Sequence, residues 1–152
     1  MLRLAWVLLP ALLAATPVNA QSPTSVDAVG STPVGVWQDV SNRIQVEIVP
    51  CGDRLCGTLV WFRWPNDAEG LPLVDLMNKD PALRGRPLLG LTILQGLRRT
   101  SERTWEDGKI YNPQDGVNYQ ARMSIRKDGA LRLRAYVLLP ILGKTHIWTR
   151  IR

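Results

Sequence analysis

The sequence has few of the residues from which reactive centres are usually built. Its 152 residues include one histidine, His146, and two cysteines, Cys51 and Cys56. No serine or cysteine stands at a nucleophile-like spacing from His146, and these three residues are too few for a tetrahedral zinc site. The acidic residues between 75 and 80 lack the spacing and central glycine of a calcium loop. The sequence therefore predicts no catalytic residue, no metal and no cofactor.

Long apolar runs are also missing, except near the N-terminus. Residues 4–15 are nearly all apolar, follow one positive charge at Arg3, and lead to a small-residue end at Ala20. This arrangement is typical of a secretory signal peptide. A membrane anchor needs about 20 apolar residues, whereas Pro10, Pro17 and Asn19 interrupt the first twenty residues. We expect residues 1–20 to be a signal peptide cleaved after Ala20, which leaves a periplasmic or secreted protein without a membrane span.

The charge of the remaining chain is positive. Removing residues 1–20 takes away Arg3 and leaves 18 Lys and Arg against 13 Asp and Glu, a net charge of +5. Such a balance favours anionic surroundings, for example phospholipid headgroups or cell-wall polymers. Export and the scattered arginines argue against nucleic acid as a partner. A solvated basic surface that only keeps the protein soluble remains the alternative.

The chain beyond the leader divides into a short arm and one domain. Residues 21–33 are small, polar and contain proline and glycine, which predicts a flexible arm. Residues 34–152 show no internal repeat and have the length of a single domain. We therefore expect one folded unit over 34–152.

The periodicity of this domain is two. In 118–125 every second residue is apolar, which is typical of a half-buried strand. Asp128-Gly129 is a strong signal for a tight hairpin turn. No segment longer than a turn or two has helical spacing. The pattern predicts an all-β, antiparallel domain with strands near 35–40, 44–50, 55–64, 88–98, 103–111, 117–126, 130–138 and 143–151.

One connection, residues 65–87, has little period-two pattern and is rich in charged residues. Within it Asp80 can cap one helical turn, Pro81 fits its first position, and Gly85 can form a left-handed exit. Irregular loops of this length are often lids or binding loops. A loop that only plugs one end of a barrel would have the same sequence features, so both interpretations stay open.

The two cysteines bracket a predicted hairpin turn. Four residues separate Cys51 from Cys56, and a hairpin between them brings their Cα atoms within disulfide range. A redox-active pair usually has two intervening residues. We expect a structural disulfide, as is usual in an oxidising compartment.

Two groups of large apolar residues stand out, the tryptophans and the run around Pro140. Five tryptophans lie beyond the leader, and they either fill a core or line a ligand cavity. The leucines and isoleucine around Pro140, in 138–142, break the alternation. That run predicts a bend or an apolar patch at one end of the domain.

Two short motifs lie near the ends of the domain. Gly35-Val36-Trp37 opens the first expected strand, and Trp148-Thr149-Arg150 lies in the last. Together they resemble the lipocalin (calycin) signature, in which an arginine from the last strand covers the tryptophan of the first. The resemblance implies that Trp37 and Arg150 close a barrel, since guanidinium stacks on indole and its donors can bind backbone carbonyls.

A wider set of motifs resembles the bacterial family called domain of unknown function 2147, small exported proteins with a lipocalin-like fold. The matching pieces lie at 35–37, 55–57, 80–91, 108–113, 142–145 and 148–150, with Cys51, Asp75, Asn78, Trp105, Asp115, Gly116 and Tyr119. The chain departs from the family pattern at Ala135 and His146, which puts a special role for His146 in doubt. The resemblance implies a small antiparallel lipocalin-like barrel of about eight strands, and it implies no reaction.

From these patterns we expect an exported binding protein, not an enzyme. It would hold a small hydrophobic or amphipathic molecule in or at the mouth of the barrel. We expect the polar lining to come from the long loop and two strand tyrosines: Asp75, Asn78, Arg84, Arg86, Tyr111 and Tyr119. The alternative is that Asp75, Arg84 and Arg86 only pin the loop through ion pairs.

A second hypothesis is an envelope interaction protein whose basic outer face docks on an anionic polymer or a protein partner. The arginines that motivate it are Arg98, Arg99, Arg103, Arg122, Arg126, Arg132 and Arg134.

Overall fold

The computed structural model describes residues 32–152. The expected signal peptide, its cleavage point and residues 21–31 of the expected arm lie outside the described residues. The last two residues of that arm are bound to the folded domain, because Pro33 is buried and its carbonyl accepts a hydrogen bond from Nε1 of Trp37 at 2.7 Å. No helix within 32–152 is long and apolar enough to cross a membrane.

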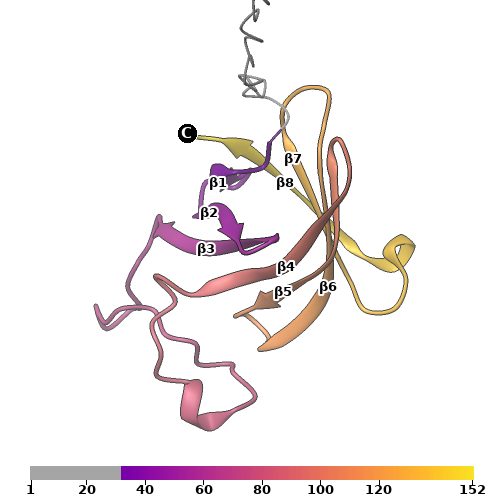
Figure 1. The fold of residues 1–152 in the computed structure, drawn as a ribbon. Helices are drawn as coiled ribbons and strands as arrows, with labels where there is room; N and C mark the ends of the chain where they lie inside the picture. Colours follow the sequence, from indigo (N-terminus) through magenta and orange to yellow (C-terminus); the bar gives the residue numbers. More distant parts are fainter. Residues whose placement is uncertain (1–31) are drawn as a thin grey trace, which may run out of the picture.

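Eight antiparallel strands form a closed barrel in which each strand pairs with the next along the chain (Figure 1). They are β1 (Gly35–Asp39), β2 (Ile44–Cys51), β3 (Arg54–Phe62), β4 (Thr92–Ser101), β5 (Thr104–Asn112), β6 (Val117–Ile125), β7 (Leu131–Tyr136) and β8 (Lys144–Arg150). The prediction of an all-β barrel of about eight strands is confirmed.

The expected start of the fourth strand at residue 88 is wrong. A turn precedes β4: the amide of Leu91 donates to the carbonyl of Leu88, and Gly90 has a φ of 84°. Leu88 and Leu91 of this segment are half-buried and Leu89 is exposed, and none of the three belongs to the strand. The alternation of apolar and polar residues does not by itself distinguish a turn that contains apolar residues from the end of a strand.

The barrel closes between its first and last strands. Trp37 of β1 stands opposite Arg150 of β8, and the guanidinium of Arg150 lies 4.3 Å from the centre of the Trp37 ring. Arg150 also donates to the carbonyls of Val34, at 2.7 Å, and Thr32. One side chain therefore covers the indole and binds the chain entering β1.

The hairpin between β2 and β3 carries the predicted disulfide, which is confirmed. Gly52 has a φ of 69° at the first position of a two-residue turn, where glycine is favoured. The Cα atoms of Cys51 and Cys56 lie 5.8 Å apart and the two residues are bonded. The bridge pins the end of this hairpin.

Side chains fill the barrel interior. The largest fully buried apolar residues come from most strands of the barrel: Trp37, Val46, Ile48, Leu94, Leu97, Met123, Leu131 and Leu133. Trp105 and Trp148 are also buried, whereas Trp61 and Trp64 are exposed. Three of the five tryptophans are therefore part of a filled core, which was one of the two interpretations. The two exposed tryptophans belong neither to a core nor to a cavity.

Residues 65–87 form one irregular excursion between β3 and β4 (Figure 1). It contains the 3₁₀ turn η1 (Pro81–Leu83), capped as predicted because Oδ1 of Asp80 accepts the amide of Ala82 at 2.9 Å. The predicted left-handed exit at Gly85 is wrong: this glycine has no positive φ, and the turn ends at Arg84 in ordinary helical conformation. An isolated bridge from Val74 to Pro87 closes the base of the loop.

A buried polar network and a recess beside the long loop

The two faces of β5 have different surroundings. Gly108 faces the interior, because a side chain there would collide with that of Leu97. Ile110, two residues on, faces the same way and pairs with Leu94. Tyr111 therefore lies on the opposite, outer face of the barrel wall, yet it is buried. Its cover comes from the long loop.

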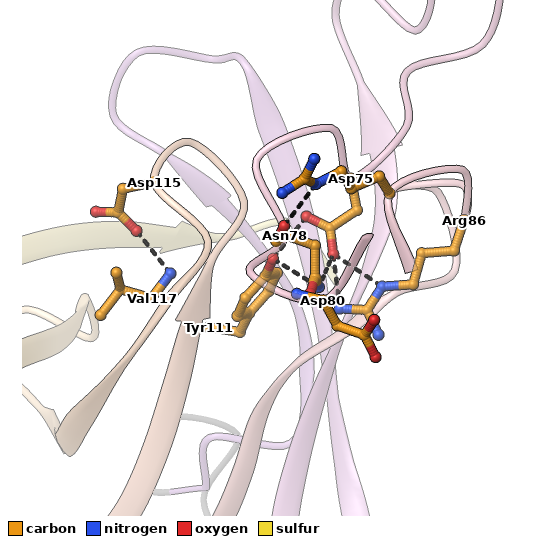
Figure 2. Close-up of polar contacts among 8 residues, drawn as sticks. Asp75, Asn78, Asp80, Arg86, Tyr111, Asp115 and Val117 are labelled. Atoms are coloured by element: carbon orange, nitrogen blue, oxygen red, sulfur yellow. Dashed lines mark hydrogen bonds and ion pairs between the residues drawn. The ribbon is translucent and has the colours of Figure 1, made fainter. Parts of the chain in front are cut away.

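The loop and β5 are joined by four of the six side chains expected to line a binding site (Figure 2). Asp75 is fully buried. Its Oδ1 accepts a hydrogen bond from the Tyr111 hydroxyl at 2.7 Å, and its Oδ2 accepts from Nδ2 of Asn78 at 2.7 Å. Arg86 donates to the same Oδ2 through Nε at 2.8 Å and Nη2 at 2.7 Å. Asn78 also donates to the Tyr111 oxygen at 3.0 Å.

This network determines the protonation of its members. Burial alone would raise the pKa of Asp75, but hydrogen bonds from Asn78, Tyr111 and Arg86 together lower it below its ordinary value. Burial raises the pKa of Tyr111, and the neighbouring Asp75 carboxylate raises it further. Asp75 is therefore an anion and Tyr111 a neutral donor over a wide pH range.

The two arginines of the loop bind its own atoms. Arg84 donates from Nε to the carbonyl of Asn78 at 2.9 Å, and Arg86 lies over the Tyr111 ring at 5.3 Å in addition to its ion pair with Asp75. The Arg86–Asp75 ion pair is of the kind that the pinning interpretation expects, whereas Arg84 forms a hydrogen bond to a backbone carbonyl. The polar atoms of Asp75 and Asn78 are directed at each other and at Tyr111 rather than at solvent.

Tyr119 belongs to a separate cluster at the β5–β6 turn. Its hydroxyl donates to Oδ2 of Asp115 at 2.8 Å, and Oδ1 of Asp115 accepts the amide of Val117 at 2.9 Å. Figure 2 shows Asp115 and Val117 set apart from the Asp75 network. Burial would raise the pKa of Asp115, but its hydrogen bonds, led by that of Tyr119, lower it.

A recess of about 370 Å³ lies on the outer wall beside the loop. It is lined by Ile93, Gln95, Lys109, Tyr111, Asn118, Tyr119 and Gln120. Pairing across β4, β5 and β6 puts the side chains of Gln95, Lys109 and Gln120 in one row on this wall. Tyr111 is shared between the recess and the buried network.

Of the six predicted lining residues, only Tyr111 and Tyr119 border this recess. The others that border it were not predicted, although the alternation had marked Asn118 and Gln120 as polar positions of their strand. The missing information was the register, which puts those positions beside Gln95 and Lys109.

The matching family model covers residues 35–150 and is described as "Uncharacterized protein conserved in bacteria (DUF2147)". The chain belongs to this family. The comparison with curated proteins finds no match. Among solved structures, the chain is similar to "Protein HP1028 from the human pathogen Helicobacter pylori", which is described as belonging to the lipocalin family. The two chains are 26% identical with a TM-score of 0.66, over 78% of this chain and 82% of that one.

The basic surface of this DUF2147 protein is partly neutralised by its own acids. Arg98 is paired with Asp107, with Nη2 at 2.5 Å from Oδ2, and Arg126 with Asp128 at 3.1 Å. Arg122 is paired with Glu106. Three of the seven arginines behind the basic-surface hypothesis are thus paired with a nearby carboxylate. Within residues 32–152, no group of three or more His, Cys, Asp and Glu is placed to hold a metal ion.

Proposed function

We propose that this DUF2147 protein binds a small anionic, partly apolar molecule in the recess on the outer wall of β4, β5 and β6. The observation that carries the proposal is the recess itself, about 370 Å³ with converging polar side chains. Known sites for small ligands have volumes of about 300–1,000 Å³ and combine apolar walls with a few placed polar groups. The recess has a volume in this range. Its lining is mainly polar, through Gln95, Lys109, Asn118 and Gln120, with Ile93 and the Tyr111 ring as its apolar part.

The lining favours a carboxylate or a similar anion at one end of the ligand. Lys109 forms no ion pair with any residue in 32–152, whereas Arg98 of β4 and Arg122 of β6 each pair with an acid of β5. Its neighbours Gln95, Asn118 and Gln120 carry neutral side-chain amides, which can donate hydrogen bonds to an anion. Ile93 and the Tyr111 ring supply an apolar wall for the rest of the molecule.

The buried network supports this proposal by fixing one wall of the recess. Tyr111 has its hydroxyl bound to Asp75 and its ring under Arg86. A side chain held on both sides keeps one orientation, so little entropy is lost when a ligand contacts it. In this interpretation Asp75, Asn78, Arg84 and Arg86 position the site and do not touch the ligand.

The filled interior favours the outer wall over the barrel lumen as the binding place. Met123, Leu131 and Leu133 occupy interior positions at which an open barrel would hold its ligand. The lipocalin-like fold and the family favour a binding protein over an enzyme. The disulfide Cys51–Cys56 fits an oxidising location such as the periplasm or the extracellular space.

The proposal can be tested with 1-naphthoate and its neutral analogue 1-naphthamide as probes, by isothermal titration calorimetry. Wild-type protein is expected to bind the carboxylate more tightly than the amide. Lys109→Gln should weaken naphthoate binding about fivefold, the effect of a solvent-accessible ion pair of about 1 kcal/mol, and leave naphthamide unchanged.

Lys127→Gln is the matched control. Lys127 is exposed near the β6–β7 turn, outside the recess, so the same loss of charge there should leave both affinities unchanged. Equal weakening by both variants would show that only overall charge matters. Failure of both probes to bind would contradict the proposed ligand class.

A further inference from the structure

The connection between β7 and β8 exposes a cluster of aliphatic side chains, residues 137–142, here called the apolar tip. Leu138, Ile141 and Leu142 are 82%, 79% and 77% exposed, and Val137 and Leu139 are exposed as well. Figure 1 shows this connection, with the 3₁₀ turn η2 (Pro140–Leu142), extending away from the barrel body. Five exposed aliphatic residues within six positions are unusual for a surface that stays in water.

Several backbone groups of the apolar tip have hydrogen-bond partners within the hairpin. The amide of Leu142 donates to the carbonyl of Leu139 at 3.0 Å. Arg134 reaches from β7 to donate to the carbonyls of Pro140 and, at 2.8 Å, Ile141. Carbonyls and amides that already have partners can enter an apolar medium without the cost of losing water. The tip therefore presents its aliphatic side chains to solvent, while the carbonyls of Leu139, Pro140 and Ile141 are bonded within the hairpin.

The hairpin that carries the tip has charges of one sign only. Residues 129–152 contain five Lys and Arg and no Asp or Glu. Arg134 and Lys144 flank the tip directly, and the known acceptors of Arg134 are uncharged oxygens. The positive charge at the base of the tip is thus not cancelled by a carboxylate of its own hairpin.

We propose that the apolar tip docks this protein on the surface of an anionic phospholipid bilayer. The aliphatic side chains would enter the boundary between headgroups and acyl chains, where they gain from burial without needing a shaped pocket. Arg134 and Lys144 would then lie at the level of the anionic headgroups, which attract basic residues near the surface. A projecting tip with a cationic base fits a soft anionic surface better than a second protein, which would need a matching apolar hollow. This proposal does not depend on the ligand recess.

The test is flotation of the protein with vesicles of phosphatidylcholine, with and without 30 mol% phosphatidylglycerol. Wild-type protein should float with the anionic vesicles and bind the neutral ones much less. Leu138→Ser combined with Ile141→Ser should reduce the partition coefficient at least tenfold, because both burial contributions are lost. Lys144→Ala should reduce it about fivefold, and the difference should shrink at high salt.

The matched control is Leu71→Ser combined with Leu76→Ser. These leucines are 63% and 68% exposed but lie in the long loop, so the control should float like wild type. Near-ultraviolet circular dichroism checks that each variant keeps its packed tryptophans. Equal losses in both double variants, or no flotation of wild type, would overturn the proposal. Self-association abolished by the tip substitutions would also overturn it, in favour of a second copy of the chain.

Discussion

Asp75 shows how one buried carboxylate organises a segment that has little regular structure. It receives hydrogen bonds from Tyr111, Asn78 and Arg86, so its charge is both compensated and fully hydrogen-bonded. A buried ion in this state costs little, but the removal of any donor leaves part of its solvation cost uncompensated. The loop is therefore sensitive to small changes at these residues.

Tyr111→Phe should destabilise the protein although it removes a single oxygen. The hydroxyl is a donor to a buried carboxylate, and such hydrogen bonds contribute about 1.5–3 kcal/mol. We expect the free energy of unfolding to fall by about 2 kcal/mol in urea denaturation. Tyr136→Phe, a half-buried tyrosine of β7 for which no side-chain hydrogen bond is seen, is the control and should change it little. Equal effects would contradict the assigned role of the Tyr111 hydroxyl.

The same network predicts an acid-dependent loss of stability. The pKa of Asp75 in the folded protein lies below its ordinary value of about 3.9. A carboxyl group whose pKa is lowered on folding stabilises the folded state at pH values above its ordinary pKa. This contribution is lost as the pH falls from about 4 through the pKa of the folded state. Wild type should therefore lose stability faster than Asp75→Asn between pH 6 and pH 2, as measured by urea unfolding. If the unfolding free energies of the two proteins changed in parallel with pH, the assigned lowering of the Asp75 pKa would be wrong.

At the scale of the element, the long loop is held to the barrel in a second place. Gly116, at the β5–β6 turn, has a φ of 68°, and a Cβ on it would lie 2.0 Å from the carbonyl oxygen of Met77. The loop backbone thus passes directly over this turn. Only glycine permits both the turn conformation and the approach.

Gly116→Ala should therefore release the loop. Its control is Gly129→Ala, which has a φ of 81° but nothing near its Cβ, so it carries the backbone strain alone, about 1–2 kcal/mol. We expect amide hydrogen exchange at 75–78 to accelerate at least tenfold in Gly116→Ala and to stay unchanged in Gly129→Ala. The same exchange rates in both variants would show that the Met77 contact does not hold the loop.

The strands and turns were predictable because their signals are local. Alternation of apolar and polar residues indicates the strands. Asp128-Gly129 indicates the turn between β6 and β7, and Asp80 indicates the start of η1. The turn from Leu88 to Leu91 was not predictable from the alternation, because hydrogen bonds to the distant Leu59 hold it. The 3₁₀ turn at Pro140 appeared in the sequence only as broken alternation.

The candidate site was predictable in part. The structure brings Asp75 and Arg86 of the loop together with Tyr111, whereas a role of these residues in ligand binding stays a prediction. Their arrangement was not, because strand register decides that Tyr111 points outward and that Lys109 lies beside Gln95 and Gln120. A one-residue shift in register would have put each of these side chains on the other face.

At the scale of the whole molecule, closure depends on contacts between distant parts of the chain. The Trp37–Arg150 contact joins the first and last strands, while the disulfide closes only the short loop from Cys51 to Cys56. The disulfide therefore contributes little to the topology and acts on one hairpin.

Replacing both cysteines with serine should leave the barrel folded. The chain-entropy estimate for so short a loop is about 2 kcal/mol. We expect a decrease of that size in the free energy of unfolding, with an unchanged near-ultraviolet circular dichroism spectrum at 25 °C. Loss of the folded spectrum in the double variant would show that the hairpin is needed to close the barrel.

The account rests most on the position of the ligand, outside the barrel wall and beside the loop. Chemical-shift mapping of ¹⁵N-labelled protein titrated with 1-naphthoate tests this directly. The predicted shifts are confined to amides of 93–95, 109–111 and 118–120, which surround the recess. Shifts centred on Trp37, Met123 and Leu133 would place the ligand inside the barrel and contradict the account.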